Sequence, residues 1–293
     1  MRLLLEKLGY RKRNGHWFHK TSKLIFLGDL IDRGPEQIET VELVQNLERN
    51  GLALCLMGNH EFNAVGFATE APESSGEFIR KHNSRNIGQH EKFLEEYANK
   101  SASYKDTIKW MAGLPVWYES KNVRAVHACW HRESQNQLGD LLTENHRPKD
   151  INFFVESGIN NSKLFSAREN LLSGLELKLP SGKHFFDFYG VKRTKIRVNW
   201  WTRDQKTYRD SAVISNSQKH NIPNVQLINP SPYYDETICF FGHYWMSGIP
   251  LIKHPRAICL DYSVALKSGL LCGYRFKNER NAIQENLVWQ KKL

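Results

Sequence analysis

The sequence lacks the features of a membrane-spanning or exported chain. No apolar run within its 293 residues approaches the roughly 18 residues that cross a bilayer. The opening residues MRLLLEK are too short for a signal peptide and lack its small-residue cleavage site. We therefore expect a cytoplasmic protein with no membrane partner.

Paired cysteines are also absent. The five cysteines lie far apart in the sequence, and none forms a C-x-x-C pair. This spacing excludes a zinc knuckle and gives no sign of a disulfide framework. Each cysteine sits in an apolar run such as Leu54-Cys55-Leu56, so we expect buried, reduced thiols.

Internal repeats and low-complexity tracts are missing as well. Hydrophobic residues make up 40% and charged residues 25% of the chain, which is ordinary for a globular enzyme. The length suits one large domain over residues 1–293. The net charge of +10 predicts an anionic substrate or partner. No nucleic-acid partner is predicted, because the basic residues are scattered along the sequence and no known binding motif occurs.

Short apolar runs alternate with amphipathic segments, which indicates an α/β fold. Residues 23–28 predict a buried strand, and residues 52–57 predict a second one parallel to it. The helix between them opens at Pro35. The predicted apolar face of this helix is Ile38, Val41, Val44 and Leu47. Four further strands are predicted, at Val123–His127, Thr237–Phe241, Ala257–Leu260 and Leu270–Arg275.

The segment 132–197 is less regular and more polar than the rest of the chain. It holds a helical piece at 162–172 and loops with glycine or proline at Gly174, Pro180 and Gly182. We expect it to be an insertion at the rim of the site rather than a second domain.

Acidic, amide and imidazole side chains follow the predicted strands. Residues 28–34 read GDLIDRG, residues 58–61 read GNHE, and His127 and His243 end two later strands. Open α/β sheets bind ligands at the carboxyl ends of their strands. Oxygen and imidazole donors without cysteine suit manganese, iron or zinc bound for hydrolysis. Singly, the loop could be a helix cap with a salt bridge and each histidine structural, but together they predict a metal site.

These motifs resemble the phosphoprotein phosphatase family of calcineurin-like metallophosphoesterases. The family signature runs G-D-x-H-G, G-D-x-x-D-R-G, G-N-H-E and then two later histidines, and residues 28–34 and 58–61 match the second and third elements at every fixed position. His127 is followed by alanine where the family more often has glycine, and Gly242-His243 matches the last element. The resemblance runs from Met1 to about Arg275.

The resemblance implies a calcineurin-like metallophosphatase fold, in which two mixed β-sheets pack as a sandwich flanked by helices. The G-D-x-H-G element is absent, and the leucines of residues 3–8 are spaced as if the chain began inside a helix. We therefore expect the first strand, with its Asp and His ligands, to lie upstream of Met1. The family binds two metal ions, and the ligands left in this chain predict one.

By the same resemblance, Asp29 would bridge the metals, and Asn59, His127 and His243 would complete the shell of the second ion, with manganese preferred over iron or zinc. A hydroxide between the metals would attack phosphorus in line.

Three further roles follow from the resemblance. His60, oriented by Asp32, would be the general acid. Arg33 would bind the phosphate oxygens. Arg203 is the candidate for a second phosphate-binding arginine, with Arg197 behind it, although an arginine after two tryptophans can also simply stack on them.

Three functions fit these motifs. The leading one is a phosphomonoesterase, with protein phosphoserine or phosphothreonine as a plausible substrate. The second is a nucleotide hydrolase resembling the diadenosine tetraphosphatases. The nucleobase of its substrate would stack on aromatic residues at the rim, or these residues belong to the hydrophobic core instead: Trp130, Trp200, Trp201 and Trp245. The third is a non-catalytic phosphate-binding relative, favoured by the missing ligands and disfavoured by the intact Asp32, Arg33 and His60.

Overall fold

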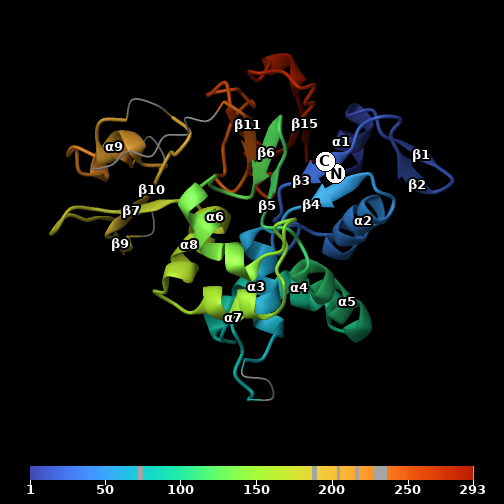
Figure 1. The fold of residues 1–293 in the computed structure, drawn as a ribbon, viewed down its shortest axis with the longest axis horizontal. Coiled ribbons are helices and arrows are strands. Elements are labelled where there is room, and N and C mark those ends of the chain that lie inside the picture. Colours follow the sequence, from blue (N-terminus) through green and yellow to red (C-terminus); the bar gives the residue numbers. More distant parts are fainter. Residues whose placement is uncertain (72–74, 187–189, 203–204, 215–217, 228–235, 293) are drawn as a thin grey trace.

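The computed structural model describes residues 1–292 except 72–74, 187–189, 203–204, 215–217 and 228–235. In Figure 1, β-sheets form the upper part of the molecule, helices lie below them, and a β-ribbon projects to the left. Within the described ranges, no helix is long and apolar enough to span a bilayer.

The central sheet is built around β11 (Ile238–Phe241). This strand pairs in parallel with β6 (Val123–Val126) on one side and with β12 (Ala257–Cys259) on the other. Strand β5 (Trp117–Glu119) adds an antiparallel edge next to β6. All four residues of β11 are buried, as expected for a strand covered on both faces. The three strands predicted in these regions are confirmed.

A second, antiparallel sheet covers one face of the central sheet. Its strands are β13 (Asp261–Tyr262), β14 (Leu270–Tyr274) and β15 (Leu287–Lys291). Ile238, Phe240 and Ile258 pack against Leu287 of this layer, while the alternate residues of β11 join the main core on the opposite face. The two layers form the sandwich that we expected from the sequence. The short helix α1 (Arg2–Lys7) lies against β14 and β15.

The parallel pair β3 (Leu24–Phe26) and β4 (Ala53–Cys55) is joined by the crossover helix α2 (Gln37–Arg49). The four residues of the predicted apolar face of α2 are all buried. The α2 N-terminus has no cap of its own. Instead, the Glu96 carboxylate accepts hydrogen bonds from the amides of Gln37 and Ile38, each at 3.0 Å.

A tight turn is formed by Asn14 and Gly15. It joins β1 (Arg11–Arg13) to β2 (His16–Phe18). Asn14 and Gly15 both have positive φ, of 50° and 82°, as a two-residue hairpin turn requires.

Six helices pack below the sheets. They are α3 (Asn59–Ala68), α4 (Ser84–Tyr97), α5 (Ser101–Ala112), α6 (Arg132–Leu138), α7 (Asn152–Gly158) and α8 (Lys163–Ser173). Phe62 of α3 stacks on Phe154 of α7 with ring centroids 5.2 Å apart. Helix α8, the one that the sequence predicted, begins at the N-cap Ser162, whose side chain accepts from the amide of Phe165. Apolar residues of α6, α7 and α8 belong to the main core.

The ribbon that projects from this body has its own small core. Its elements are β7 (Glu176–Lys178), β8 (Phe185–Phe186), β9 (Lys192–Arg193), β10 (Lys195–Arg197) and α9 (Tyr208–Ser211). Strand β10 pairs with β7, and β9 pairs with β8, both antiparallel. Leu179, Phe185, Ile196, Tyr208 and Ile222 form a cluster separate from the main core. The range 132–197 therefore contains helices of the main body followed by this ribbon.

Candidate metal centre

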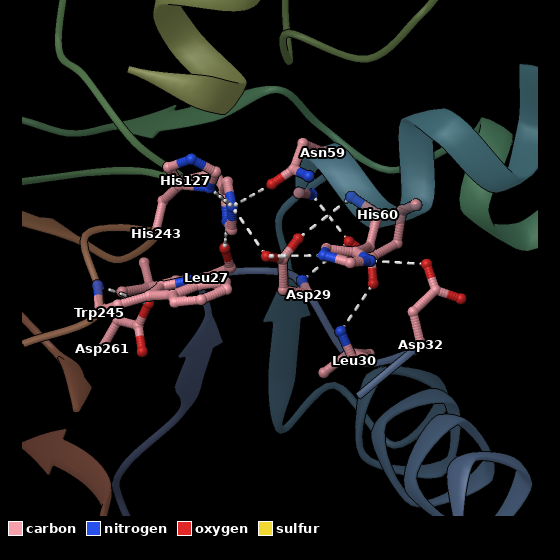
Figure 2. A network of polar contacts seen from close by, with 12 residues as sticks. Leu27, Asp29, Leu30, Asp32, Asn59, His60, His127, His243, Trp245 and Asp261 are labelled. Carbon is pink, nitrogen blue, oxygen red and sulfur yellow. Dashed lines mark hydrogen bonds and ion pairs between the residues drawn. The ribbon is translucent and has the colours of Figure 1, made fainter. Parts of the chain in front are cut away.

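The segments that follow four strands meet at one place in the molecule (Figure 2). Asp29 follows β3, Asn59 follows β4, His127 follows β6 and His243 follows β11. Two parallel strand pairs thus present their carboxyl ends to the same point. The His127 Nδ1 donates to the carbonyl of Leu27, which ties the two pairs together.

Asp29, His127 and His243 form a cluster of metal-ligand type. One donor atom from each residue lies within 4.8 Å of the others. The His127 Nε2 is 3.3 Å from Asp29 Oδ2, 3.3 Å from His243 Nδ1 and 3.2 Å from Asn59 Oδ1. The structure therefore brings together all four residues that the sequence predicted as metal ligands.

The surroundings of His127 favour positive charge at this cluster. Burial opposes the charged form, but the neighbouring Asp29 carboxylate raises the pKa of His127 to about 9. Since Nδ1 faces a carbonyl, Nε2 points at the carboxylate. A metal ion would take the place of the proton held there.

His243 completes the set as a neutral imidazole. Burial, and then the nearby His127, lower the pKa of His243 well below its ordinary value. Its Nδ1 faces His127, and its Nε2 is buried with no hydrogen-bond partner in the described part of the chain. Carboxylate, amide and neutral imidazole donors fit manganese, iron or zinc.

A second network surrounds Asp32. Its Oδ2 accepts from His60 Nδ1 at 2.6 Å, and its Oδ1 accepts from His90 Nδ1 at 2.6 Å. The other nitrogen of His60, Nε2, lies 3.8 Å from Asp29 Oδ2. Burial lowers the pKa of His60, but the carboxylates of Asp29 and then Asp32 raise it, and the resulting pKa lies above its ordinary value. His60 is thus held by Asp32 with its Nε2 turned toward the cluster.

Glu61 has a role that the sequence did not reveal. This fully buried carboxylate accepts from the amides of Asp29, Leu30 and Gly58, at 2.8, 2.8 and 2.9 Å. It joins the loop after β3 to the start of α3. The motif GNHE contains Glu61, but a positioning role appears only when both loops are seen together.

Two glycines allow the same loops to touch. A Cβ on Gly28 would lie 2.5 Å from the amide nitrogen of Gly58, and a Cβ on Gly58 would lie 2.6 Å from the amide nitrogen of Asp29. Real side chains do not fit at these distances. The first glycine of each motif is therefore needed for the close approach that sets Asp29 beside Asn59.

Left-handed backbone is concentrated around the cluster. Asp29, Asp32, His243 and Trp245 have φ values of 57°, 75°, 69° and 47°. Such conformations cost roughly 1–3 kcal/mol each and persist where the surrounding structure enforces them, often at functional sites. The backbone conformation of these loops thus helps to fix where the carboxylate and imidazole side chains of this site point.

The four tryptophans considered for the rim separate into two groups. Trp130, Trp200 and Trp201 are buried, at 6%, 2% and 4% exposure, whereas Trp245 is 51% exposed. The Arg33 guanidinium lies over the Trp245 ring, 4.7 Å from its centroid, and the Trp245 amide donates to Asp261 Oδ2 at 3.2 Å. Trp245 therefore belongs to the surface beside the metal cluster, and the other three belong to the core.

Of the two arginines predicted as a second phosphate contact, the structure describes only one. Arg203 lies outside the described residues. Arg197 is half-buried at the end of β10, with no partner for its Nε among the described residues. Its charge adds to the depression of the His243 pKa, after burial and His127, so it lies near the cluster.

Comparison with known proteins agrees with this geometry. Residues 3–244 match the family model described as calcineurin-like phosphoesterase. The chain is 43% identical to the asymmetrical bis(5'-nucleosyl)-tetraphosphatase PrpE of Oceanobacillus iheyensis over an aligned segment of 58 residues. This segment makes up 20% of the present chain and 23% of the length of that relative. It is 21% identical over 266 aligned residues to the symmetrical bis(5'-nucleosyl)-tetraphosphatase of Colwellia psychrerythraea. This alignment covers 83% of the present chain and 82% of that relative.

Among solved structures, the cold-active protein-tyrosine phosphatase of a Shewanella species is 19% identical over 92% of this chain and 69% of that one, with a TM-score of 0.41. The family match covers most of the present sequence and includes every residue of the metal-type cluster. The chain belongs to the calcineurin-like phosphoesterase family.

Proposed function

We propose that this chain is a metal-dependent hydrolase of phosphate esters and anhydrides. The convergence of Asp29, Asn59, His127 and His243 on one point carries the proposal. These residues would hold a divalent cation, with manganese preferred over iron or zinc. When bound, such an ion supplies a concentrated positive charge that polarises phosphoryl oxygen and acidifies water.

The surrounding side chains fit the remaining needs of the reaction. His60 is held by Asp32, and its pKa is raised, which favours the form that would deliver an Nε2 proton to the leaving oxygen. Arg33 would contact the phosphate oxygens through its guanidinium, whose planar shape suits two parallel hydrogen bonds. Its stacking on Trp245 holds the guanidinium at the rim.

A nucleotide, of the dinucleoside polyphosphate type, is the substrate class that we favour. The half-exposed Trp245 ring lies beside a phosphate-binding arginine, an arrangement that lets a nucleobase stack while its phosphates reach the metal. The relatives named above are dinucleoside tetraphosphatases. A phosphomonoester, such as a phosphoserine peptide, is the second candidate, because His60 and Arg33 act on the phosphate group alone.

The test compares three substrates in manganese: diadenosine tetraphosphate, a phosphoserine peptide and p-nitrophenyl phosphate. Trp245→Ala should lower kcat/KM for the dinucleotide about tenfold or more, the scale of one stacked base, beyond any loss for p-nitrophenyl phosphate, which reports the release of Arg33 alone. Trp17→Ala, at a half-buried tryptophan of the β1–β2 hairpin, is the control. Preferred turnover of the peptide with no effect of Trp245→Ala would instead support the phosphomonoesterase.

A further inference from the structure

The segment that contains the ribbon carries more than half of the net positive charge of the chain. Residues 174–227 hold ten Lys and Arg against four Asp and Glu, a net charge of +6 out of +10 for the whole chain. This segment, which includes the ribbon that projects from the body (Figure 1), thus has a larger excess of basic over acidic residues than the rest of the chain.

The two faces of the ribbon differ in chemistry. Leu177 and Ile196 are opposite each other and face the small apolar cluster of the ribbon. Lys178 and Lys195 are also directly opposite each other, and both are exposed. Because side chains alternate along a strand, the basic pair lies on the face turned away from that cluster.

This basic pair is unfavourable unless an anion covers it. Like charges directly opposite each other on neighbouring strands destabilise a sheet. In the described part of the chain, neither Lys178 nor Lys195 forms a salt bridge with a carboxylate. On the same face Glu176 lies opposite Arg197, so the excess positive charge that this face presents to the solvent is that of Lys178 and Lys195.

The same face leads toward the metal centre. Lys195 and Arg197 occupy alternate positions of β10, with their Cα atoms roughly 6.6 Å apart. Beyond Arg197 the chain continues to Trp201, which packs on Phe241 at the end of β11, with ring centroids 4.9 Å apart. The basic positions thus form a line that starts beside the phosphate-processing centre.

Exposed aromatic surface accompanies the charge. Phe186 is 53% exposed and lies opposite Lys192 in the β8–β9 pair. Its ring contacts that of His184, with centroids 5.5 Å apart. Aromatic rings interleaved with a line of cations suit a chain of bases and phosphates, since bases stack on the rings while phosphates meet the cations.

We propose that this ribbon binds single-stranded nucleic acid. The sugar-phosphate backbone lies along Lys178, Lys195 and Arg197, and a base stacks on Phe186. The linear arrangement favours a strand over an anionic membrane, which would meet a flat surface. The proposal depends on the ribbon alone and not on the reaction proposed for the metal centre.

The experiment measures binding of fluorescein-labelled oligo(dT) by anisotropy, in EDTA so that no metal is bound. The double variant Lys178→Ala/Lys195→Ala is compared with Lys105→Ala/Lys109→Ala, which removes two exposed lysines from α5. The ribbon variant should bind about tenfold more weakly, with a salt dependence of log K reduced by about 1.4, since each phosphate contact on a single strand contributes about 0.7. The α5 variant should bind like the wild type. Phe186→Ala should cost about a further tenfold.

Equal losses in both double variants would overturn the proposal, because they would report net charge and not a ribbon surface. Binding to phosphatidylserine vesicles in the absence of oligonucleotide binding would also overturn it, in favour of a lipid surface. Hydrolysis of diadenosine tetraphosphate by the ribbon variant should equal that of the wild type. If oligonucleotide binding is lost while this hydrolysis is unchanged, the binding surface on the ribbon is independent of the metal centre.

Discussion

His60 lies with Nδ1 on Asp32 and Nε2 toward Asp29, so its expected part in turnover is to protonate the leaving oxygen. His60→Asn should lower turnover of aryl phosphates with poor leaving groups by roughly 100-fold, the usual scale of a general acid. p-Nitrophenyl phosphate should lose much less, because its leaving group needs little protonation. Steady-state rates across a series of aryl phosphates measure this, and a loss independent of the leaving group would remove His60 from the role.

Residue identities were predictable where a motif fixes them. The sequence located Asp29, Asn59, His127 and His243, because each follows a strand whose apolar run is visible. It did not find His90, which reaches Asp32 from α4, 58 residues further along the chain. Nor could it separate Trp245 from the three buried tryptophans, since burial of a ring depends on contacts between distant segments.

At the scale of elements, the contact between the loops after β3 and β4 depends on Gly58. Gly58→Ala should push the Asp29 backbone away and weaken manganese binding, with a loss in the free energy of unfolding of roughly 1–3 kcal/mol, as for other overpacked sites. Gly34→Ala is the control, because a Cβ there meets no atom within 4 Å. Calorimetric metal titration and urea unfolding measure both effects. Unchanged affinity in Gly58→Ala would mean that the loops can separate without loss of the site.

An ion-pair cluster joins β5, β6 and α6. Glu119 accepts from Arg132 Nη1 at 2.7 Å and from Arg124 Nε at 2.9 Å, and the hydrogen bonds from Arg132 hold the pKa of Glu119 below its ordinary value. The stabilisation is therefore complete above about pH 4.5, the unfolded-state value, and is lost as the pH falls through the lower folded-state pKa.

Glu119→Gln should consequently cost about 0.5–1 kcal/mol at neutral pH, a small value because Glu119 and Arg132 are partly exposed. The difference from the wild type should narrow below pH 4.5. Urea unfolding across this pH range tests it, with the exposed Glu91→Gln of α4 as control. A difference that stays constant to low pH would show that the charge of Glu119 contributes nothing.

The helices and strands that could be predicted from the sequence are those with a clear run or periodic pattern of apolar residues. The unit from β3 through α2 to β4 and the later strands β6, β11, β12 and β14 showed in the sequence as apolar runs. The prediction that the first of these strands is buried was wrong, because Ile25 of β3 is 36% exposed. Helices α4 and α5 did not, because each buries only a few residues, such as Phe93, Tyr97 and Met111. The ribbon strands have two or three residues each, too few for an alternation to be recognised.

For the whole molecule, metal binding should be visible as stability. Manganese at about 100 times its dissociation constant should raise the free energy of unfolding by about 2.7 kcal/mol, with one ion per chain for the ligand set described. His243→Ala removes a ligand and should abolish the rise in melting temperature, while His16→Ala on the exposed hairpin should not. Thermal unfolding and metal analysis measure this. An equal rise in His243→Ala would place the ion elsewhere.

The separate apolar cluster of the ribbon has a consequence for how such a protein can change over evolutionary time. Leu179, Phe185, Ile196 and Tyr208 pack mainly among themselves, whereas the side chains of the metal centre rest on the main core. Substitutions within the ribbon at positions away from Arg197, which lies near His243, can therefore accumulate without disturbing the loops that carry Asp29 and His243. Descendants of one ancestral hydrolase could acquire new binding preferences by replacing this module while the reaction at the metal stays the same.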